Sequence, residues 1–126
     1  MPNHAEVHEF LRALIRTVKP EQIAATGVTP EGVRIAAEAQ RATGIGRTSE
    51  IAAGAAPKTK IDMLLCGSQA QESEVRRLLP QVSPHGLVLL HDREAALRMQ
   101  QEGLLAVVVM PTPDTLVLAQ RRDKRG

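Results

Sequence analysis

Aromatic residues are almost missing from this 126-residue sequence, which has one phenylalanine, Phe10, and neither tryptophan nor tyrosine. Proteins that bind single-stranded nucleic acids stack the bases on aromatic side chains, so the composition argues against that function. The net charge of +2 is also small, and much of the basic excess lies in the terminal segment RRDKRG, which we interpret as a solvated tail. We therefore expect no nucleic-acid partner.

Cysteine and long apolar runs are scarce as well. The single cysteine, Cys66, can form neither an internal disulfide nor a zinc site built from several thiolates, and is best read as a small buried apolar residue. No segment approaches the roughly 18 consecutive apolar residues that a membrane span requires. The first residues lack the basic and apolar regions of a secretion signal. These absences predict a cytoplasmic protein with no membrane partner.

The length of the chain is enough for one hydrophobic core and too small for two. Hydrophobic residues make up 43% of the sequence and charged residues 24%, which is typical of a soluble globular domain. We expect residues 1–126 to form a single domain.

Helical patterns are present in four segments. Residues 4–18 carry one apolar stripe, with Asn3 as a possible N-cap, and Ser68 with Gln71 forms a capping-box pattern before the third segment. Thr29 before Pro30, and Asp92, are capping residues for the second and fourth segments. The predicted helices cover residues 4–18, 30–43, 72–79 and 93–103.

Short apolar runs separate these segments. Those at residues 22–26, 47–51, 60–65 and 86–91 predict strands, the last one launched by turn residues Pro84 and Gly86. Runs that are apolar on both sides belong to parallel sheets covered by helices. Two final runs, residues 104–110 and 115–120, are separated only by PTPD, which permits an antiparallel hairpin and excludes a helical crossover.

The pattern as a whole predicts a doubly wound α/β fold: a mostly parallel sheet, helices on both faces and a C-terminal antiparallel hairpin. Ligands of such sheets bind beyond the carboxyl ends of the strands. The candidate site residues are therefore those at the strand ends: Gly27, Glu50, Cys66, Gly67, His91 and Asp92.

The histidines differ in what they suggest. His91 ends an apolar strand, and because an unperturbed imidazole titrates near neutral pH, it is a candidate general base, with Asp92 to orient it. The alternative is that Asp92 only caps the next helix and that His91 is a half-exposed strand-end residue. His4 and His8 have a spacing that can grip a metal, but no third ligand is visible, and we expect surface histidines.

These segments resemble, in order, the class I S-adenosylmethionine-dependent methyltransferases of the small-molecule O-methyltransferase type. The matching pieces are FLRALIRTVKPEQIAATGVTPEGVRIAAEA, GRTSEI, KIDMLLCGSQAQESEVRRLLPQVSPHGLVLLHD and GLLAVVVMPTPDTLVLAQRR.

The resemblance implies a Rossmann-like fold and methyl transfer from S-adenosylmethionine to a hydroxyl of a small-molecule acceptor. The cofactor would be held by the Gly27 turn, by Glu50 at the ribose, and by Cys66 and Gly67. Cys66 stands where metal-dependent members of the family have an aspartate, and because sulfur is a poor ligand for magnesium we expect no metal.

One segment is shorter than the resemblance implies. Only residues 51–60 separate the second predicted strand from the third, too few for the helix-strand-helix that the family has there. Residues 47–51 should then form an exposed sheet edge, a template for pairing with another copy, so we expect a homo-oligomer. The loss also leaves open a second interpretation, a catalytically inactive domain that serves as a scaffold or assembly partner.

Overall fold

One six-stranded sheet runs through the molecule. The computed structural model describes residues 4–44, 46–52, 54–55, 57, 59–67, 69–109 and 116–122. The elements are α1 (His4–Val18), β1 (Gln22–Thr26), α2 (Pro30–Thr43), β2 (Arg47–Glu50), β3 (Ile61–Cys66), α3 (Glu72–Leu78), the 3-10 turn η1 (Leu79–Gln81), β4 (Val82–Leu90), α4 (Arg93–Gln101), β5 (Leu105–Val109) and β6 (Val117–Arg121).

The strands lie in the order β2-β1-β3-β4-β6-β5. Strands β2, β1, β3 and β4 are parallel to one another, whereas β6 is antiparallel to both of its neighbours, β4 and β5. The predicted mostly parallel sheet with a C-terminal hairpin is confirmed, because β5 and β6 form that hairpin. The residues that join them lie outside the described part of the chain.

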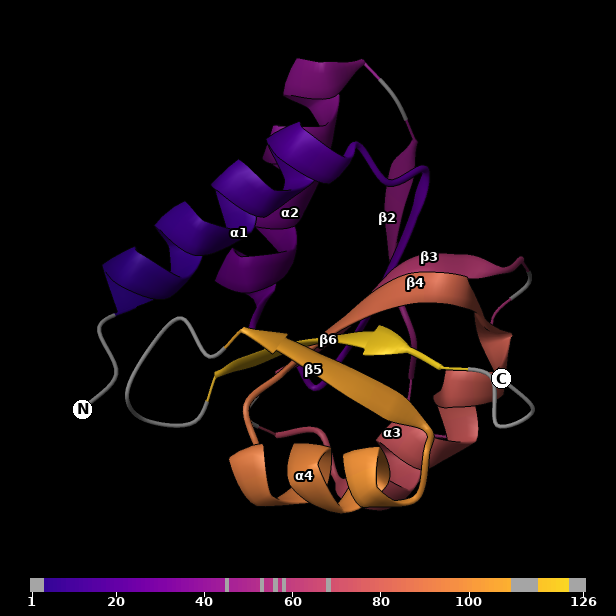
Figure 1. The fold of residues 1–126 in the computed structure, drawn as a ribbon. Coiled ribbons are helices and arrows are strands. Elements are labelled where there is room, and N and C mark those ends of the chain that lie inside the picture. The colour runs from indigo at the N-terminus through magenta and orange to yellow at the C-terminus, as the bar shows by residue number, and fades with distance from the viewer. Residues whose placement is uncertain are drawn as a thin grey trace.

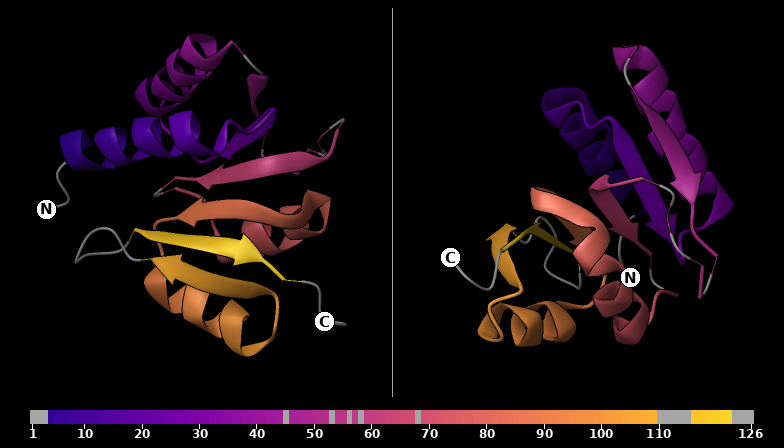
Figure 2. Two further views of the ribbon diagram at one scale, coloured as in Figure 1. Left: turned by 45° about the horizontal axis from the view of Figure 1, so that its top comes forward. Right: turned by 90° about the vertical axis from the view of Figure 1, so that its right-hand side faces the viewer.

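Helices cover both faces of the sheet, as predicted. Figure 1 shows α1 and α2 side by side on one face and α3 and α4 on the other, and the views of Figure 2 agree. Alternate residues of β3 point to opposite faces: Met63 packs beneath α1 and α2, and Leu64 packs beneath α3 and α4. Each face therefore has its own hydrophobic cluster.

Strand β2 is the free edge of the sheet, as the short segment after it predicts. Among the described strands it pairs with β1 alone, and three of its four residues are exposed. The backbone N–H groups of Arg47 and Ile51 donate to the carbonyls of Glu21 and Ala25 in and before β1. Because successive residues of a strand face opposite sides, Thr48 and Glu50 turn their backbone groups outward.

The start of β4 differs from the prediction. The strand begins at Val82, and the turn residues Pro84 and Gly86 lie inside it. Val82 pairs with Ile61 and Leu87 with Met63, so the residues between Val82 and Leu87 bulge out of the ladder. The bulge is held by β6, whose Gln120 side chain donates to the carbonyl of His85 at 3.0 Å.

The start of α3 also differs from the predicted capping box. The N-cap is Gln71, whose side chain makes no capping hydrogen bond, and the proposed first member, Ser68, lies outside the described residues. The caps of α2 and α4 are as predicted: the side chain of Thr29 accepts from the N–H of Gly32, and that of Asp92 from Ala95. No helix within the described residues is long and apolar enough to cross a membrane.

Candidate functional site

The parallel register places the predicted site residues along one edge of the sheet. Glu50 is level with Ala25 in β1, and Cys66 is level with Thr26. Leu89 of β4 pairs with Leu65, so His91 follows its strand at the level of Gly67. The expectation that the strand ends gather at a shared edge is therefore confirmed.

The backbones at the ends of β1 and β3 are in direct contact. Gly27 adopts φ +62°, and the N–H of Gly67 donates to the carbonyl of Thr26 at 2.9 Å. A Cβ atom at Gly67 would lie under 3.0 Å from the carbonyl of Gly27, and one at Gly27 under 3.0 Å from the backbone of Ala70. We call this contact of Thr26, Gly27, Gly67 and Ala70 the glycine joint; only glycine allows so close an approach.

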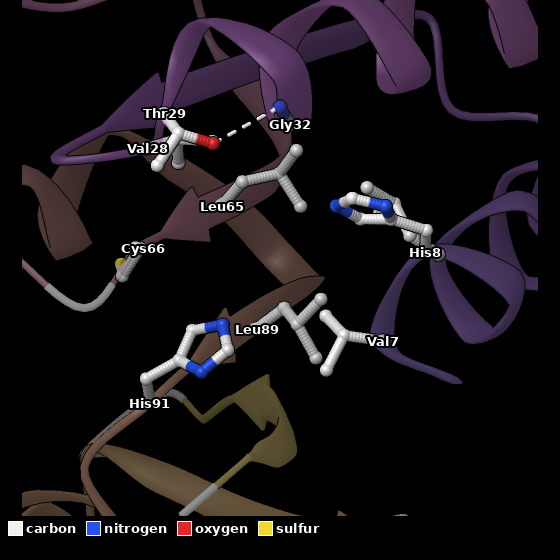
Figure 3. Close-up of a pocket in the computed structure, with 11 residues that line it drawn as sticks. Val7, His8, Val28, Thr29, Gly32, Leu65, Cys66, Leu89 and His91 are labelled. Carbon is white, nitrogen blue, oxygen red and sulfur yellow. Dashed lines mark hydrogen bonds between the residues drawn. The ribbon is translucent and has the colours of Figure 1, made fainter. Parts of the chain in front are cut away.

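A cavity opens beside the glycine joint, between the ends of β3 and β4 and the first helix. Its volume is about 240 Å³. Figure 3 shows Leu65 and Leu89 between two histidines, with His91 on one wall and His8 of α1 on the opposite one. We call it the histidine cavity. Its described lining consists of Val7, His8, Leu11, Val28, Thr29, Gly32, Leu65, Cys66, Gly67, Leu89 and His91.

The lining of the histidine cavity is mainly apolar. Among the described residues that line it there is no aspartate, glutamate, lysine or arginine. Its polar side chains are His8, His91 and Thr29, together with the thiol of Cys66, and the Thr29 oxygen already accepts from Gly32 at 3.2 Å. A ligand in this cavity therefore meets imidazoles as its main hydrogen-bonding groups.

Cys66 lies at the foot of the cavity with 3% of its surface exposed. Burial in apolar surroundings raises the pKa of its thiol to about 12, because desolvation disfavours the thiolate. The thiolate is the reactive form, so Cys66 is unsuited to nucleophilic chemistry. Its small apolar role agrees with the prediction from sequence.

Asp92 is not among the residues that line the histidine cavity. Its Oδ1 accepts from the N–H of Ala95 at 3.0 Å and so caps α4. It lines a smaller cavity of about 70 Å³ together with Glu72, His91 and Cys66. The structure thus shows Asp92 in the capping role that was the alternative to catalysis, and it also places Asp92 in the wall of a cavity that His91 lines.

Glu50 belongs to a third hollow. This open groove of about 520 Å³ runs along a face of β1 and β2 that none of the described helices covers, and it is also lined by residues of the short segment before β3. The carboxylate of Glu50 is exposed, and the groove shares no residue with the histidine cavity. None of these three cavities is lined by both Gly27 and Glu50.

His8 is the site residue that the sequence analysis missed. It was expected to be a surface histidine, yet its side chain lines the cavity between Val7 and Leu11. Its position was a usable signal, since His8 lies three residues before Leu11 and so shares a face of the helix with a buried residue. No group of three or more potential metal ligands gathers within the described chain.

The fold is shared with solved methyltransferases. The chain is similar to the O-methyltransferase from Bacillus cereus in complex with SAH, with a TM-score of 0.61 and 10% identity over 91% of this chain and 80% of that one. It is also similar to the SAH-bound methyltransferase PaMTH1 from Podospora anserina, with a TM-score of 0.57 and 12% identity over 98% and 80% of the two chains.

A third similar structure is the O-methyltransferase TomG from Streptomyces achromogenes in complex with SAM, with a TM-score of 0.50, 11% identity, and coverage of 92% and 79%. No protein-family model and no curated protein matches the chain by sequence. The described fold is therefore the Rossmann-like fold of class I methyltransferases, and at these identities the likeness rests on structure alone.

Proposed function

We propose that the protein transfers a methyl group from S-adenosylmethionine to a hydroxyl of a small molecule. The observation that carries this proposal is the histidine cavity, which opens at the carboxyl ends of β3 and β4 with His91 in its wall. Ligands of open α/β sheets bind at this edge. Similar folds come from methyltransferases solved with SAH or SAM, two of which are O-methyltransferases.

Such a cofactor would be held by residues at the ends of β1, β2 and β3. The exposed carboxylate of Glu50 is a suitable partner for two ribose hydroxyls, and it lies one strand away from the Gly27 turn. Gly67 and Cys66 continue the same edge on β3. When bound, the cofactor supplies a methyl group activated on a sulfonium. The histidine cavity, without a carboxylate in its described lining, is left for the acceptor.

In this reaction the protein has to align the acceptor oxygen with the methyl group and remove the hydroxyl proton. Methyl transfer is an in-line displacement, so holding the acceptor oxygen in place supplies much of the rate. An imidazole at His91 accepts the hydroxyl proton as the oxygen is methylated, a contribution of about 10²–10⁴-fold. Asp92 follows His91 directly, and we assign its negative charge the secondary task of stabilising the imidazolium that forms.

Calorimetric titration with S-adenosylmethionine tests the cofactor assignment. We expect micromolar binding, weakened by at least tenfold in Glu50→Gln, which keeps the size of the side chain and removes its charge. Glu38→Gln on α2 is the matched control, since Glu38 is another exposed carboxylate outside the site. Unchanged affinity in Glu50→Gln would show that the ribose partner is assigned wrongly.

His91 is tested by turnover. With radiolabelled S-adenosylmethionine and a panel of small phenols and alcohols, His91→Phe should lower methyl transfer by about 10²-fold or more. The control is His85→Asn, which removes an exposed histidine in the β4 bulge and suits its positive φ of 66°. Equal turnover in His91→Phe and the unaltered protein contradicts the assignment of the base.

The glycine joint favours a second candidate function, a scaffold or assembly partner without catalysis. Its backbone contacts close the ends of β1 and β3 over the Gly27 turn that should face a cofactor. If the joint stays closed, neither heat nor thermal stabilisation will be observed at millimolar S-adenosylmethionine. That result would leave the scaffold function and remove the enzyme.

Self-association through β2 is compatible with both functions, and we propose that a second copy extends the sheet at this edge. The outward backbone groups of Thr48 and Glu50 are available for strand pairing. Light scattering should give a mass above that of the monomer at micromolar concentration. Glu50→Pro removes one outward N–H and should return the monomer, whereas Glu50→Gln keeps the N–H and should not. A monomeric unaltered protein contradicts the proposal.

A further inference from the structure

The first helix contributes a polar group to the histidine cavity in addition to closing it. His8 projects from α1, in the cavity wall that Val7 and Leu11 also form, and one of its ring nitrogens points toward the space beside Leu65 (Figure 3). His91 reaches the same space from the end of β4, on the other side of these leucines. Two imidazoles therefore stand at opposite ends of an apolar slot.

The charge of the cavity limits what it accepts. Lysine, arginine, aspartate and glutamate are absent from its described lining, so a phosphate, sulfonium or ammonium group would enter without a permanent opposite charge. Burying an ion without such a partner costs several kcal/mol. Neutral ligands avoid this cost, and each imidazole can donate or accept a hydrogen bond to them.

The size of the cavity limits the ligand further. Sites for drug-sized molecules have volumes of roughly 300–1,000 Å³, and this cavity has about 240 Å³. It has room for a compact molecule, such as a single substituted ring. It is too small to enclose an acceptor joined to a nucleotide or coenzyme carrier.

We propose that the acceptor is an uncharged, compact, mainly apolar molecule with an oxygen group at each of two ends, and that His8 is a specificity-determining residue for it. His91 receives the hydroxyl that is methylated, and His8 holds the oxygen at the far end. Acceptors that carry a phosphate ester are excluded from this cavity. That the bound molecule is a methyl acceptor rests on the proposed function, but the test of binding needs no cofactor.

The test uses 4-hydroxybenzyl alcohol, a neutral ring with a hydroxyl group at each end, titrated into the protein without S-adenosylmethionine. The chain has 4 histidines, so the imidazole Cε1–H signals form a simple NMR spectrum that single variants assign. We expect the signals of His8 and His91 to shift together and that of His85 to stay in place. For so small a ligand the Kd should be about 1 mM.

Two comparisons make the role of His8 specific. His8→Phe keeps the ring and removes its hydrogen bond, and should weaken 4-hydroxybenzyl alcohol about fivefold. The same variant should leave 4-methylphenol, which has one hydroxyl, within about twofold, while His91→Phe weakens both. His85→Asn is the control and should change neither affinity.

Each other outcome contradicts a defined part of the inference. A shift of His91 alone, or equal losses of both probes in His8→Phe, removes His8 from ligand recognition. Phenyl phosphate binding as tightly as 4-hydroxybenzyl alcohol removes the preference for neutral ligands. No shift at either histidine shows that the cavity takes no ligand of this class, whatever the separate cofactor titration finds.

Discussion

The two contacts between neighbouring strands at the carboxyl edge of the sheet differ. At the end of β1 and β3 the glycine joint brings backbone against backbone, and no space remains. At the end of β3 and β4, Leu65, Leu89 and His91 hold α1 away from the strand ends, and the histidine cavity forms. The difference shows that side-chain size at the last strand positions, as well as strand order, decides where this fold has a pocket.

The largest effect is expected from adding a methyl group to the glycine joint. In Gly67→Ala the new Cβ would meet the backbone of Gly27 and Val28, which cannot move aside as a flexible side chain can. We expect a loss of about 3 kcal/mol in the free energy of unfolding, or a failure to fold. Chemical denaturation measures it.

Gly44→Ala is the control for this change. Gly44 has φ +72° but nothing within 4 Å of an added Cβ, so only the backbone penalty of about 1–2 kcal/mol applies. If the two variants lose the same stability, the joint yields easily, and the contrast between a closed and an open contact is weaker than the structure shows.

The reactivity of Cys66 measures whether water reaches the end of β3, which lies between the two contacts. With a thiol pKa of about 12, only on the order of one molecule in 10⁴ carries the thiolate at pH 8. We expect a thiol reagent to label native protein far more slowly than protein in denaturant. Rapid labelling of the native state would show that water reaches the end of β3.

The same residue gives a stability comparison. Cys66→Ser buries a hydroxyl in place of the thiol and should cost about 2 kcal/mol, more than Cys66→Ala, because an unpaired buried hydroxyl is penalised. The measurement is again the free energy of unfolding. A Ser variant more stable than the Ala variant would mean that the hydroxyl finds a polar partner there.

Two leucines of adjacent strands, Leu64 and Leu89, test whether the sheet is packed less tightly beside the histidine cavity than on its other face. Leu64 is fully buried beneath α3 and α4, whereas Leu89 borders the cavity and so has fewer partner atoms. Leu64→Ala should therefore destabilise the protein by about 1 kcal/mol more than Leu89→Ala, within the usual range of about 2–5 kcal/mol for such truncations. Equal losses would show that Leu89 is packed as tightly as Leu64, and that the cavity closes in solution.

Local sequence patterns predicted most of the fold. The apolar stripe placed α1 at the observed residues, and the caps at Thr29 and Asp92 began their helices as predicted. The start of β4 was wrong because Pro84 and Gly86 carry a turn signal, while the contact that retains them in the strand comes from Gln120, 35 residues away. Such a distant partner cannot be read from a local pattern.

The sequence predicted the candidate site residues at the strand ends, but not the one on α1. Parallel register alone gathers Glu50, Cys66 and His91 at one edge, so their shared position followed from the order of strands and helices. His8 was missed because the docking of α1 decides which of its residues face the strand ends, and that docking depends on its packing against α2 and the sheet. The roles of these residues stay predictions.

The smallest expected effect on stability comes from the ion pairs of Glu72, which connect α3 to α4. Glu72, the first residue of α3, accepts from Arg98 of α4 at 2.5 Å and from Arg76 at 2.9 Å. Hydrogen bonds from Arg98 and then Arg76 lower the pKa of the Glu72 carboxyl. A lowered pKa in the folded state stabilises the fold fully above the unfolded value of about 4.3, and this contribution is lost as the pH falls through the folded value.

Glu72→Gln should therefore cost about 0.5 kcal/mol near pH 7, since the partly exposed pairs are screened by solvent. The difference between this variant and the unaltered protein should shrink as the pH falls below about 4 and as salt is added. Glu74→Gln, which removes the ion pair with Arg77 within α3 and the charge that accepts from the backbone of Gly54, is the control and should cost less. A difference that does not change with pH would show that backbone contacts at the glycine joint, and not these ion pairs, hold α3 in place.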